Sequence, residues 1–132
     1  MTTLNQDRPL SAPIVDAATE VFWAGARDGV FRIRRCTSCK QPHWYPRPMC
    51  PFCMGETVWE DATGEGEIYS VSVTRRARPI PYAIAYVRLD EGVTVLTNIV
   101  DCDLDSLRIG QRVKLCFKPA EGGAPVPMFT PA

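Results

Sequence analysis

Hydrophobic positions follow two different periods, one near the N-terminus and another over the C-terminal half of the chain. Between residues 11 and 27, apolar side chains recur at spacings of three and four, which predicts a helix with one apolar face. Ser11 or a neighbour is expected to cap this helix, and Gly29 is expected to end it. Residues 1–10 are polar and predict a loose arm. The apolar positions of the helix are Ile14, Val15, Ala18, Val21, Phe22 and Ala26.

A shorter alternation surrounds the first cysteines. Phe31 and Ile33 alternate with arginines, which predicts a strand leading into the first cysteine pair. Residues 40–49 carry three prolines and are expected to form a stiff loop that cannot be helical. Thr57 to Glu60 is interpreted as the returning strand, so that two hairpins meet as in a zinc ribbon.

From Gly64 onward the pattern is that of strands alone. Apolar residues alternate with serine and threonine over residues 69–74, and residues 82–89 are more continuously apolar, as in a central strand. The turn at residues 90–92 predicts a hairpin with residues 93–100, and alternation returns at residues 112–118. These short strands indicate a small Greek-key barrel, of which the OB-fold is a common example.

The proline-rich tail is expected to add at most a short edge strand near Met128 and Phe129. The sequence therefore predicts a mostly β protein with an N-terminal α-helix, in which a rubredoxin-like zinc ribbon precedes a small Greek-key OB-fold barrel. We expect residues 1–30 to form the arm and a docking helix, residues 31–60 the zinc ribbon, and residues 61–132 the barrel.

Four of the six cysteines form two motifs of the same spacing, separated by ten residues, Cys36-Thr37-Ser38-Cys39 and Cys50-Pro51-Phe52-Cys53. In each motif a two-residue spacer lets both sulfurs face one point, and four thiolates satisfy the tetrahedral preference of zinc. All four positions would then be filled by protein, so a structural zinc ion is predicted. Cys102 and Cys116 lie outside this set and are interpreted as free thiols packed among strands.

Charge and composition narrow the function. Fifteen basic residues balance fifteen acidic ones among 132 residues, so no net field attracts the chain to nucleic acid or an anionic membrane. Neither a signal peptide nor a span of about 20 apolar residues is found, which predicts a cytoplasmic protein with reduced thiols. No phosphate-binding loop or nucleophile motif is present, so the chain is not expected to be catalytic by itself.

Several side chains near the cysteines and in the barrel are candidates for binding. His43 is interpreted as a surface residue, with a proton donor as the alternative. Trp44 and Tyr45 are expected to pack over the cysteine motifs, and the arginines at 32, 34 and 35 to form the solvated face of a strand. A second arginine group lies in a loop between barrel strands, where guanidinium groups suit phosphate. The candidate residues for a phosphorylated ligand are Arg75, Arg76, Arg78 and Tyr82.

The order of helix, cysteine motifs and barrel resembles the small zinc-ribbon plus OB-fold proteins that accompany thiolase-superfamily enzymes in acyl-CoA metabolism. The resemblance runs from about residue 15 to residue 129. One departure is Lys40, where that family commonly has glycine. The matching positions are Phe22-Trp23-Ala24-Gly25-Ala26, Gly29, Phe31, Ile33, Arg35, the four cysteines, Pro46-Arg47, Pro51, Gly64, Gly66, Pro81-Tyr82, Gly92 and Ile109-Gly110.

This resemblance implies a non-catalytic accessory subunit of a condensing, acyl-transfer or retro-aldol enzyme, with acyl-CoA as a possible ligand of the barrel. It implies a thiolase-superfamily partner. The absence of a long apolar segment separately predicts that no membrane is involved. An alternative is a single-stranded nucleic-acid-binding module, which would need a positive groove with exposed aromatic side chains. A redox protein with iron in the cysteine site is a third interpretation.

Overall fold

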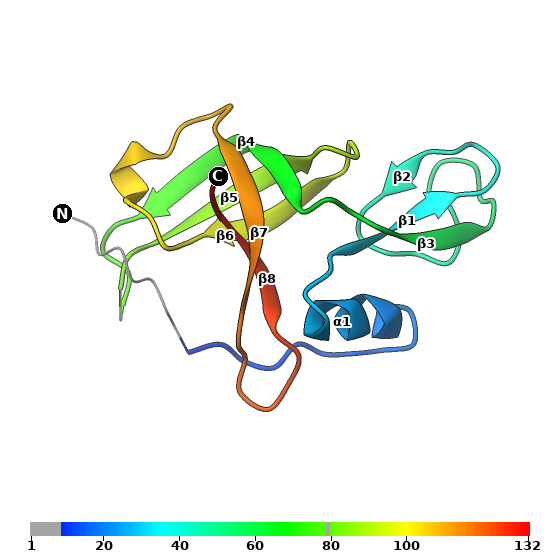
Figure 1. The fold of residues 1–132 in the computed structure, drawn as a ribbon, viewed down its shortest axis with the longest axis horizontal. Coiled ribbons are helices and arrows are strands. Elements are labelled where there is room, and N and C mark those ends of the chain that lie inside the picture. Colours follow the sequence, from blue (N-terminus) through cyan, green and yellow to red (C-terminus); the bar gives the residue numbers. More distant parts are fainter. Residues whose placement is uncertain (1–8, 79) are drawn as a thin grey trace.

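The computed structural model describes residues 9–78 and 80–132, so most of the arm predicted for residues 1–10 lies outside the described residues. A short helix is followed by a three-stranded sheet and then by a closed five-stranded barrel (Figure 1). The elements are α1 (Glu20–Arg27), β1 (Arg32–Cys36), β2 (Pro42–His43), β3 (Thr57–Asp61), β4 (Glu65–Thr74), β5 (Tyr82–Leu89), β6 (Thr94–Ile99), a 3-10 helix (Leu104–Ser106), β7 (Arg112–Lys118) and β8 (Val126–Pro131).

The helix is shorter than the apolar pattern predicts. α1 begins at Glu20, and Ser11 does not cap it but forms an isolated bridge with Glu121. Asp16 and Thr19 close the turn before the helix, because the Asp16 carboxylate accepts hydrogen bonds from the Thr19 amide and hydroxyl. These side-chain hydrogen bonds compete with helical hydrogen bonding, so the helix begins only at Glu20. Gly29 does end it, with a φ of 78°.

The small sheet has the strand order β2-β1-β3, with both pairs antiparallel. β1 pairs with β3 over five residue pairs, from Arg32 with Asp61 to Cys36 with Thr57. This long pairing confirms the predicted return strand. β2 pairs with β1 over only two residues, so the proline-rich segment contains a short strand where the sequence predicted loop alone.

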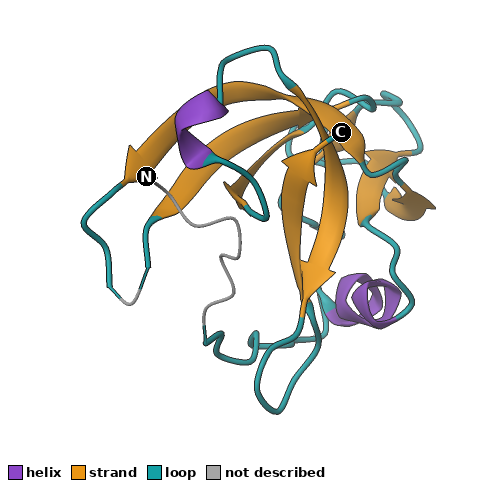
Figure 2. Cartoon of the chain, turned by 60° about the vertical axis from the view of Figure 1, so that its left-hand side comes forward, coloured by secondary structure: helices purple, strands orange, loops and turns teal. Residues whose placement is uncertain are grey.

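The barrel strands are ordered β4-β5-β6-β8-β7, and β7 pairs again with β4. This confirms the predicted Greek-key OB-fold. Figure 2 shows how strongly the long strands curve. A bulge between Ile68 and Ser70 shifts the register of β4 against β5. Ile68 is buried and Tyr69 is exposed, and because the bulge adds one residue, Val71 and Val73 return to the side that packs on the barrel core. The continuous alternation predicted from Tyr69 to Val73 is therefore wrong at its first residue.

β8 is not the short edge strand that the prolines predicted, because it closes the barrel between β6 and β7. It pairs with β7 over six residues and touches β6 at one pair, Ile99 with Phe129. The Phe129 carbonyl accepts from the Val100 amide, so residues of the same parity direct their backbone groups toward β6. Pro127 and Pro131 share that parity, and their missing amides therefore leave the ladder with β7 intact.

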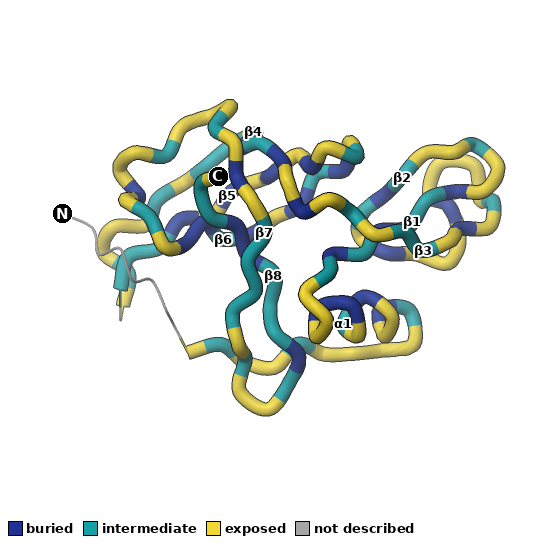
Figure 3. The backbone as a smooth tube through the Cα atoms, viewed as in Figure 1, coloured by how far each residue is buried: buried dark blue, intermediate teal, exposed yellow. Residues whose placement is uncertain are grey.

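An aromatic cluster joins the helix, the small sheet and the barrel. The ring centroids of Phe22 and Phe31 lie 5.1 Å apart, and those of Phe31 and Trp44 lie 4.9 Å apart. Phe31 also faces Phe129 of β8 at 6.4 Å. These separations suit favourable edge and tilted ring contacts. Trp44 therefore packs on Phe22 and Phe31. The sequence had instead predicted that Trp44 packs over the cysteine motifs. Buried positions line both this junction and the barrel interior (Figure 3).

Candidate metal centre

Both cysteine motifs turn back on themselves through a residue with a left-handed backbone. Lys40 follows the first motif with a φ of 66°, and Met54 follows the second with a φ of 69°. Lys40 thus adopts the conformation that the glycine of related sequences would favour. Its ammonium group donates to the Thr37 carbonyl at 2.6 Å, which helps hold this turn. Lys40 is therefore accommodated in a left-handed turn.

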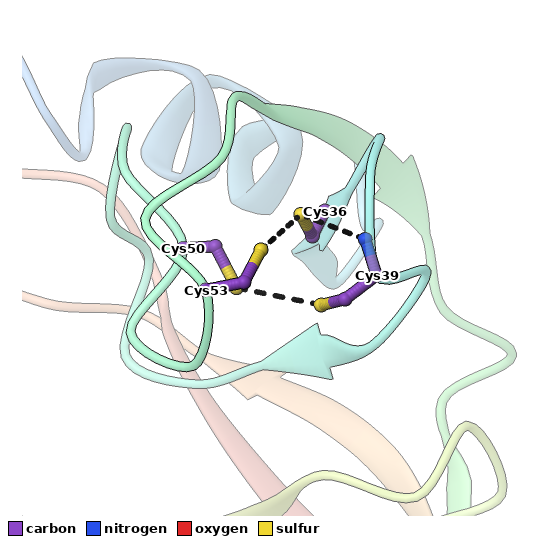
Figure 4. Close-up of side chains that lie close together, drawn as sticks. All are labelled: Cys36, Cys39, Cys50 and Cys53. Atoms are coloured by element: carbon purple, nitrogen blue, oxygen red, sulfur yellow. Dashed lines mark hydrogen bonds between the residues drawn. The ribbon is translucent and has the colours of Figure 1, made fainter.

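The structure brings Cys36, Cys39, Cys50 and Cys53 together, and the four sulfurs all lie within 4.8 Å of one another (Figure 4). The Cys36 and Cys53 sulfurs are 3.4 Å apart, and those of Cys39 and Cys50 are 3.7 Å apart. Four thiolates bound at about 2.3 Å around a tetrahedral zinc ion lie about 3.8 Å apart. The four cysteines are free thiols, and their spacing fits such an ion. A tetrahedral metal with four protein ligands leaves no position for substrate.

Backbone amides around each motif donate to the first sulfur of that motif. The amides of Ser38 and Cys39 lie 3.3 and 3.4 Å from the Cys36 sulfur, and the Phe52 amide lies 3.4 Å from the Cys50 sulfur. Donors of this kind stabilise a thiolate. The Cys39 amide, more than any other group, lowers the pKa of Cys36 to about 6.

The thiols do not all ionise together without a metal. The Gln41 amide lowers the pKa of Cys39, but burial and the neighbouring cysteines outweigh it and raise this pKa to about 11. Burial raises the pKa of Cys50, yet hydrogen bonds from the Cys53 and Phe52 amides leave it lowered overall. Metal binding would therefore displace protons from part of the cluster.

Gly55, which the sequence indicated only as part of the turn after Cys53, lies close to two of the sulfurs. A β-carbon there would lie 3.1 Å from the Cys36 sulfur and 3.3 Å from the Cys53 sulfur. The Gly55 carbonyl also accepts from the Cys50 amide at 2.8 Å. The position therefore needs a residue without a side chain. The signal in the sequence was a glycine two residues after the last cysteine.

His43 is buried, so its interpretation as a surface residue is wrong. Its Nε2 accepts from the Arg47 amide at 3.1 Å, which ties the proline-rich loop to β2. Burial lowers the pKa of His43, and the charges of Arg34 and Arg47 act in the same direction, against the hydrogen bond from the Arg47 amide. An accepting Nε2 requires the unprotonated nitrogen, so the geometry fits a neutral imidazole that supports the loop.

The arginines of β1 do not form a solvated face. The Arg32 Nε lies 3.1 Å from the Asp61 carboxylate, and Arg35 pairs with Glu60. Arg34 donates to the Thr57 carbonyl at 2.9 Å and lies 4.5 Å above the Trp59 ring. All three side chains are half-buried and fasten β1 to β3, because arginine forks combine ion pairing with stacking.

The second arginine group lies in the loop between β4 and β5, as predicted, and all three of its arginines are exposed. Arg75 pairs with Asp105 at 2.7 Å. Tyr82 lies at the start of β5, where it lines a groove of about 630 Å³ together with Phe117, Met128 and Lys118. The groove is mostly apolar and lies at the barrel end formed by the start of β5 and the end of β7. The sequence pattern did not predict this groove, because its lining residues come from separate strands.

Cys102 and Cys116 are free thiols in the described structure. Burial, followed by the charges of Asp103 and Asp101, raises the pKa of Cys102 to about 11, and burial also raises the pKa of Cys116. Neither has the low pKa of a reactive cysteine. The interpretation as packed thiols is consistent with this environment. No helix among the described residues is both long and apolar enough to cross a membrane.

Two family models match the chain, one over the ribbon and one over the barrel. Residues 23–60 match the family described as "ChsH2, rubredoxin-like zinc ribbon domain", and residues 59–118 match "ChsH2, C-terminal OB-fold domain". A solved structure named "Ltp2-ChsH2(DUF35) aldolase" superposes with a TM-score of 0.78 and 31% identity, over 90% of this chain and 98% of that chain.

Two relatives extend the comparison. A "DUF35 domain-containing scaffold protein" of Methanothermobacter thermautotrophicus is 37% identical over 91 residues, which cover 64% of this chain and 68% of that protein. A "Probable enoyl-CoA hydratase alpha subunit" of Thermomonospora curvata is 32% identical over 126 residues, which cover 91% of this chain. The chain spans only 39% of the length of the latter. From its ribbon, its barrel and these matches, the chain belongs to the ChsH2/DUF35 family of zinc-ribbon and OB-fold proteins.

Proposed function

We propose that the chain is a non-catalytic accessory subunit of a thiolase-like enzyme complex in the cytoplasm, where it binds or channels an acyl-CoA. The observation that carries this proposal is the match to a chain of the "Ltp2-ChsH2(DUF35) aldolase", of which 98% is covered. The "scaffold" description of the archaeal relative supports the same role.

In this proposal one zinc ion, held by Cys36, Cys39, Cys50 and Cys53, stabilises the ribbon and takes no part in the reaction. A ribbon of about 30 residues buries too little apolar surface to fold without such a link. Residues 31–60 then form a rigid unit beside the barrel of residues 61–132. The segment of residues 1–30 contributes Phe22 to the shared core. Ile14 and Val15 in the same segment are exposed and would be available for contact with the partner subunit.

The acyl-CoA would lie along one end of the barrel. The groove beside Tyr82 offers apolar walls for the pantetheine arm or the acyl chain. Arg76 and Arg78 lie in the loop that precedes β5, within the same part of the chain, and their guanidinium groups suit the CoA phosphates. The Arg75–Asp105 pair is exposed, and such pairs contribute only about 0–1 kcal/mol, so Arg75 could exchange its carboxylate for phosphate.

Co-expression with a thiolase-superfamily protein encoded beside this chain tests the proposal. We expect one complex on size-exclusion chromatography that contains both chains and about one zinc ion per copy of this chain. Titration of that complex with an acyl-CoA should give a Kd that rises about tenfold or more when Arg76 and Arg78 are both replaced by alanine. Separate elution of the two proteins would contradict the accessory role, and unchanged affinity would contradict the arginine contacts.

A second candidate, a module for single-stranded nucleic acid, has one observation in its favour. Tyr69 and Tyr86 are exposed on the outer face of β4 and β5, and the Arg88 guanidinium lies 4.8 Å from the Tyr69 ring. OB-folds bind oligonucleotides through this kind of surface. The equal numbers of basic and acidic residues weigh against it. Salt-sensitive micromolar binding of oligonucleotides, lost on replacing Tyr86 with alanine, would favour this candidate over the first.

A further inference from the structure

The two cysteine motifs share a backbone but differ at their tips. Each places a residue with φ near 66–69° directly after its second cysteine. The first motif carries Thr37 and Ser38 between its cysteines, and the Thr37 hydroxyl donates to the Glu56 carbonyl. The second carries Pro51 and Phe52 at the same positions. The same turn is therefore built once with polar residues and once with apolar residues.

The second motif exposes its apolar residues to solvent. Phe52 is 59% exposed, Met54 is 73% exposed and Met49 is also exposed. Beside them is a shallow groove of about 380 Å³, lined by Arg47, Pro48, Met49, Cys50, Pro51 and Met54. We refer to Arg47, Met49, Phe52 and Met54, with this groove, as the knuckle surface. Clustered exposed apolar side chains on a rigid support mark interaction sites.

The metal site does not require these side chains. Phe52 contributes to it through the backbone amide that donates to the Cys50 sulfur, and serine does the same in the first motif at Ser38. Met54 contributes a left-handed backbone conformation, which glycine adopts at lower cost. Neither packing nor ligand geometry therefore explains why large apolar residues stand at these two exposed positions.

Arg47 gives the knuckle surface a charge. The other arginines of the ribbon are engaged within the chain, Arg32 with Asp61, Arg34 with Thr57 and Arg35 with Glu60. Over the described ranges 9–78 and 80–132, the Arg47 guanidinium neither donates a hydrogen bond nor forms an ion pair, and the residue is exposed. Only its backbone is used, through the bonds to His43 and Thr57. Its positive charge is therefore available to an acidic partner.

We infer that the knuckle surface is where the chain docks onto its protein partner, which presents an apolar side chain next to a carboxylate. The apolar side chain fits the groove between Met49 and Met54, and the carboxylate pairs with Arg47. This inference rests on the proposed function, in which the partner is the thiolase-like subunit. A stable interface buries about 800 Å² on each partner, so the knuckle surface forms the centre of a larger contact.

The test compares Phe52→Ser with a control of equal exposure. Phe52→Ser copies the residue that the first motif has at Ser38, so the turn and the amide donor are retained. Leu96 of the barrel strand β6 is also 59% exposed, and Leu96→Thr removes a similar apolar side chain outside the ribbon. The partner is the thiolase-like protein that copurifies with the wild-type chain, and the Kd is measured by titration calorimetry.

We expect Phe52→Ser to raise the Kd about tenfold or more, as for a central interface residue, while Leu96→Thr leaves it unchanged. Zinc content and thermal unfolding should match the wild type in both variants. Arg47→Glu, which retains the backbone bonds, should also weaken binding and reduce its dependence on salt.

Three results would overturn the inference. Wild-type affinity of Phe52→Ser would show that the knuckle surface is outside the interface. Equal loss in Phe52→Ser and Leu96→Thr would show that binding is not localised there. If the wild-type chain binds no thiolase-like protein at all, the proposed function fails and this inference fails with it, which distinguishes that case from the first two.

Discussion

Replacing Gly55 with alanine is the smallest change that should separate metal binding from the rest of the fold. The new methyl group would lie 3.1 Å from the Cys36 sulfur, 3.3 Å from the Cys53 sulfur and 3.0 Å from the Ser38 hydroxyl oxygen. Ordinary contact begins at 3.4 Å, so the methyl group and the Cys36 sulfur would have to separate by at least a further 0.3 Å. The methyl group thus crowds two of the four candidate ligands.

The cost follows from the rigidity of a metal site. Zinc–ligand distances hold to about ±0.2 Å, so the sulfurs cannot yield while the ion is bound. The backbone must move instead, and inserting a methyl group into a packed site costs about 1–3 kcal/mol. At about 1.4 kcal/mol for each factor of ten, Gly55→Ala should weaken zinc binding about 5- to 150-fold.

Competition with a chromophoric chelator at pH 7 measures the affinity directly. The control is Gly122→Ala, in a barrel loop where φ is 72° and nothing lies within 4 Å of the added carbon. That variant strains the backbone by about 1–2 kcal/mol without approaching a sulfur, so zinc affinity should remain that of the wild type. Wild-type zinc affinity in Gly55→Ala would refute the contact argument, and equal losses in both variants would attribute the effect to global instability.

The remaining predictions concern the same region. His43→Ala should lower the free energy of unfolding of the zinc-loaded protein by about 2–4 kcal/mol in thermal denaturation, because it leaves a cavity and removes the acceptor of the Arg47 amide. A change within about 0.5 kcal/mol is typical of a surface substitution and would contradict the buried role of His43. Met54→Gly should raise that free energy by up to about 1 kcal/mol by relieving the left-handed backbone, and a loss of stability would contradict the strain argument. As the pH is lowered, zinc affinity should fall more steeply below about pH 6 than above it, because the Cys36 thiol, with a pKa of about 6, then also holds a proton that the metal must displace. A constant slope of affinity against pH from about 8 to 5 would count against this.

The sequence predicted the fold class because local signals and tertiary packing agreed over most of the chain. β5 runs from Tyr82 to Leu89 as the apolar run indicated, and Gly92, with a φ of 102°, makes the predicted turn to β6. The spacing of the four cysteines predicted that their sulfurs would meet. Each of these features depends on a period or a spacing that can be counted along the sequence.

The errors arose where a distant partner decides the outcome. β8 tolerates two prolines because their backbone sides face β6, which is a property of strand order and not of the tail itself. The hydrogen bonds between Asp16 and Thr19 make the helix begin at Glu20, although the apolar pattern begins at Ile14. Burial of His43 depends on the loop folding back so that the Arg47 amide reaches it. No count of residue types contains that contact.

The aromatic cluster has a practical consequence for spectroscopy. All three tryptophans of the chain, Trp23, Trp44 and Trp59, lie within α1 and the ribbon, and the barrel contains none. Trp44 is in contact with Phe22 and Phe31, and Trp59 lies beneath the Arg34 guanidinium. Intrinsic tryptophan emission therefore reports on α1, the ribbon and their shared aromatic cluster, and no tryptophan lies in the barrel strands. A fluorescence change on adding a chelator, measured beside far-ultraviolet circular dichroism of the strands, would distinguish local opening of the ribbon from unfolding of the whole chain.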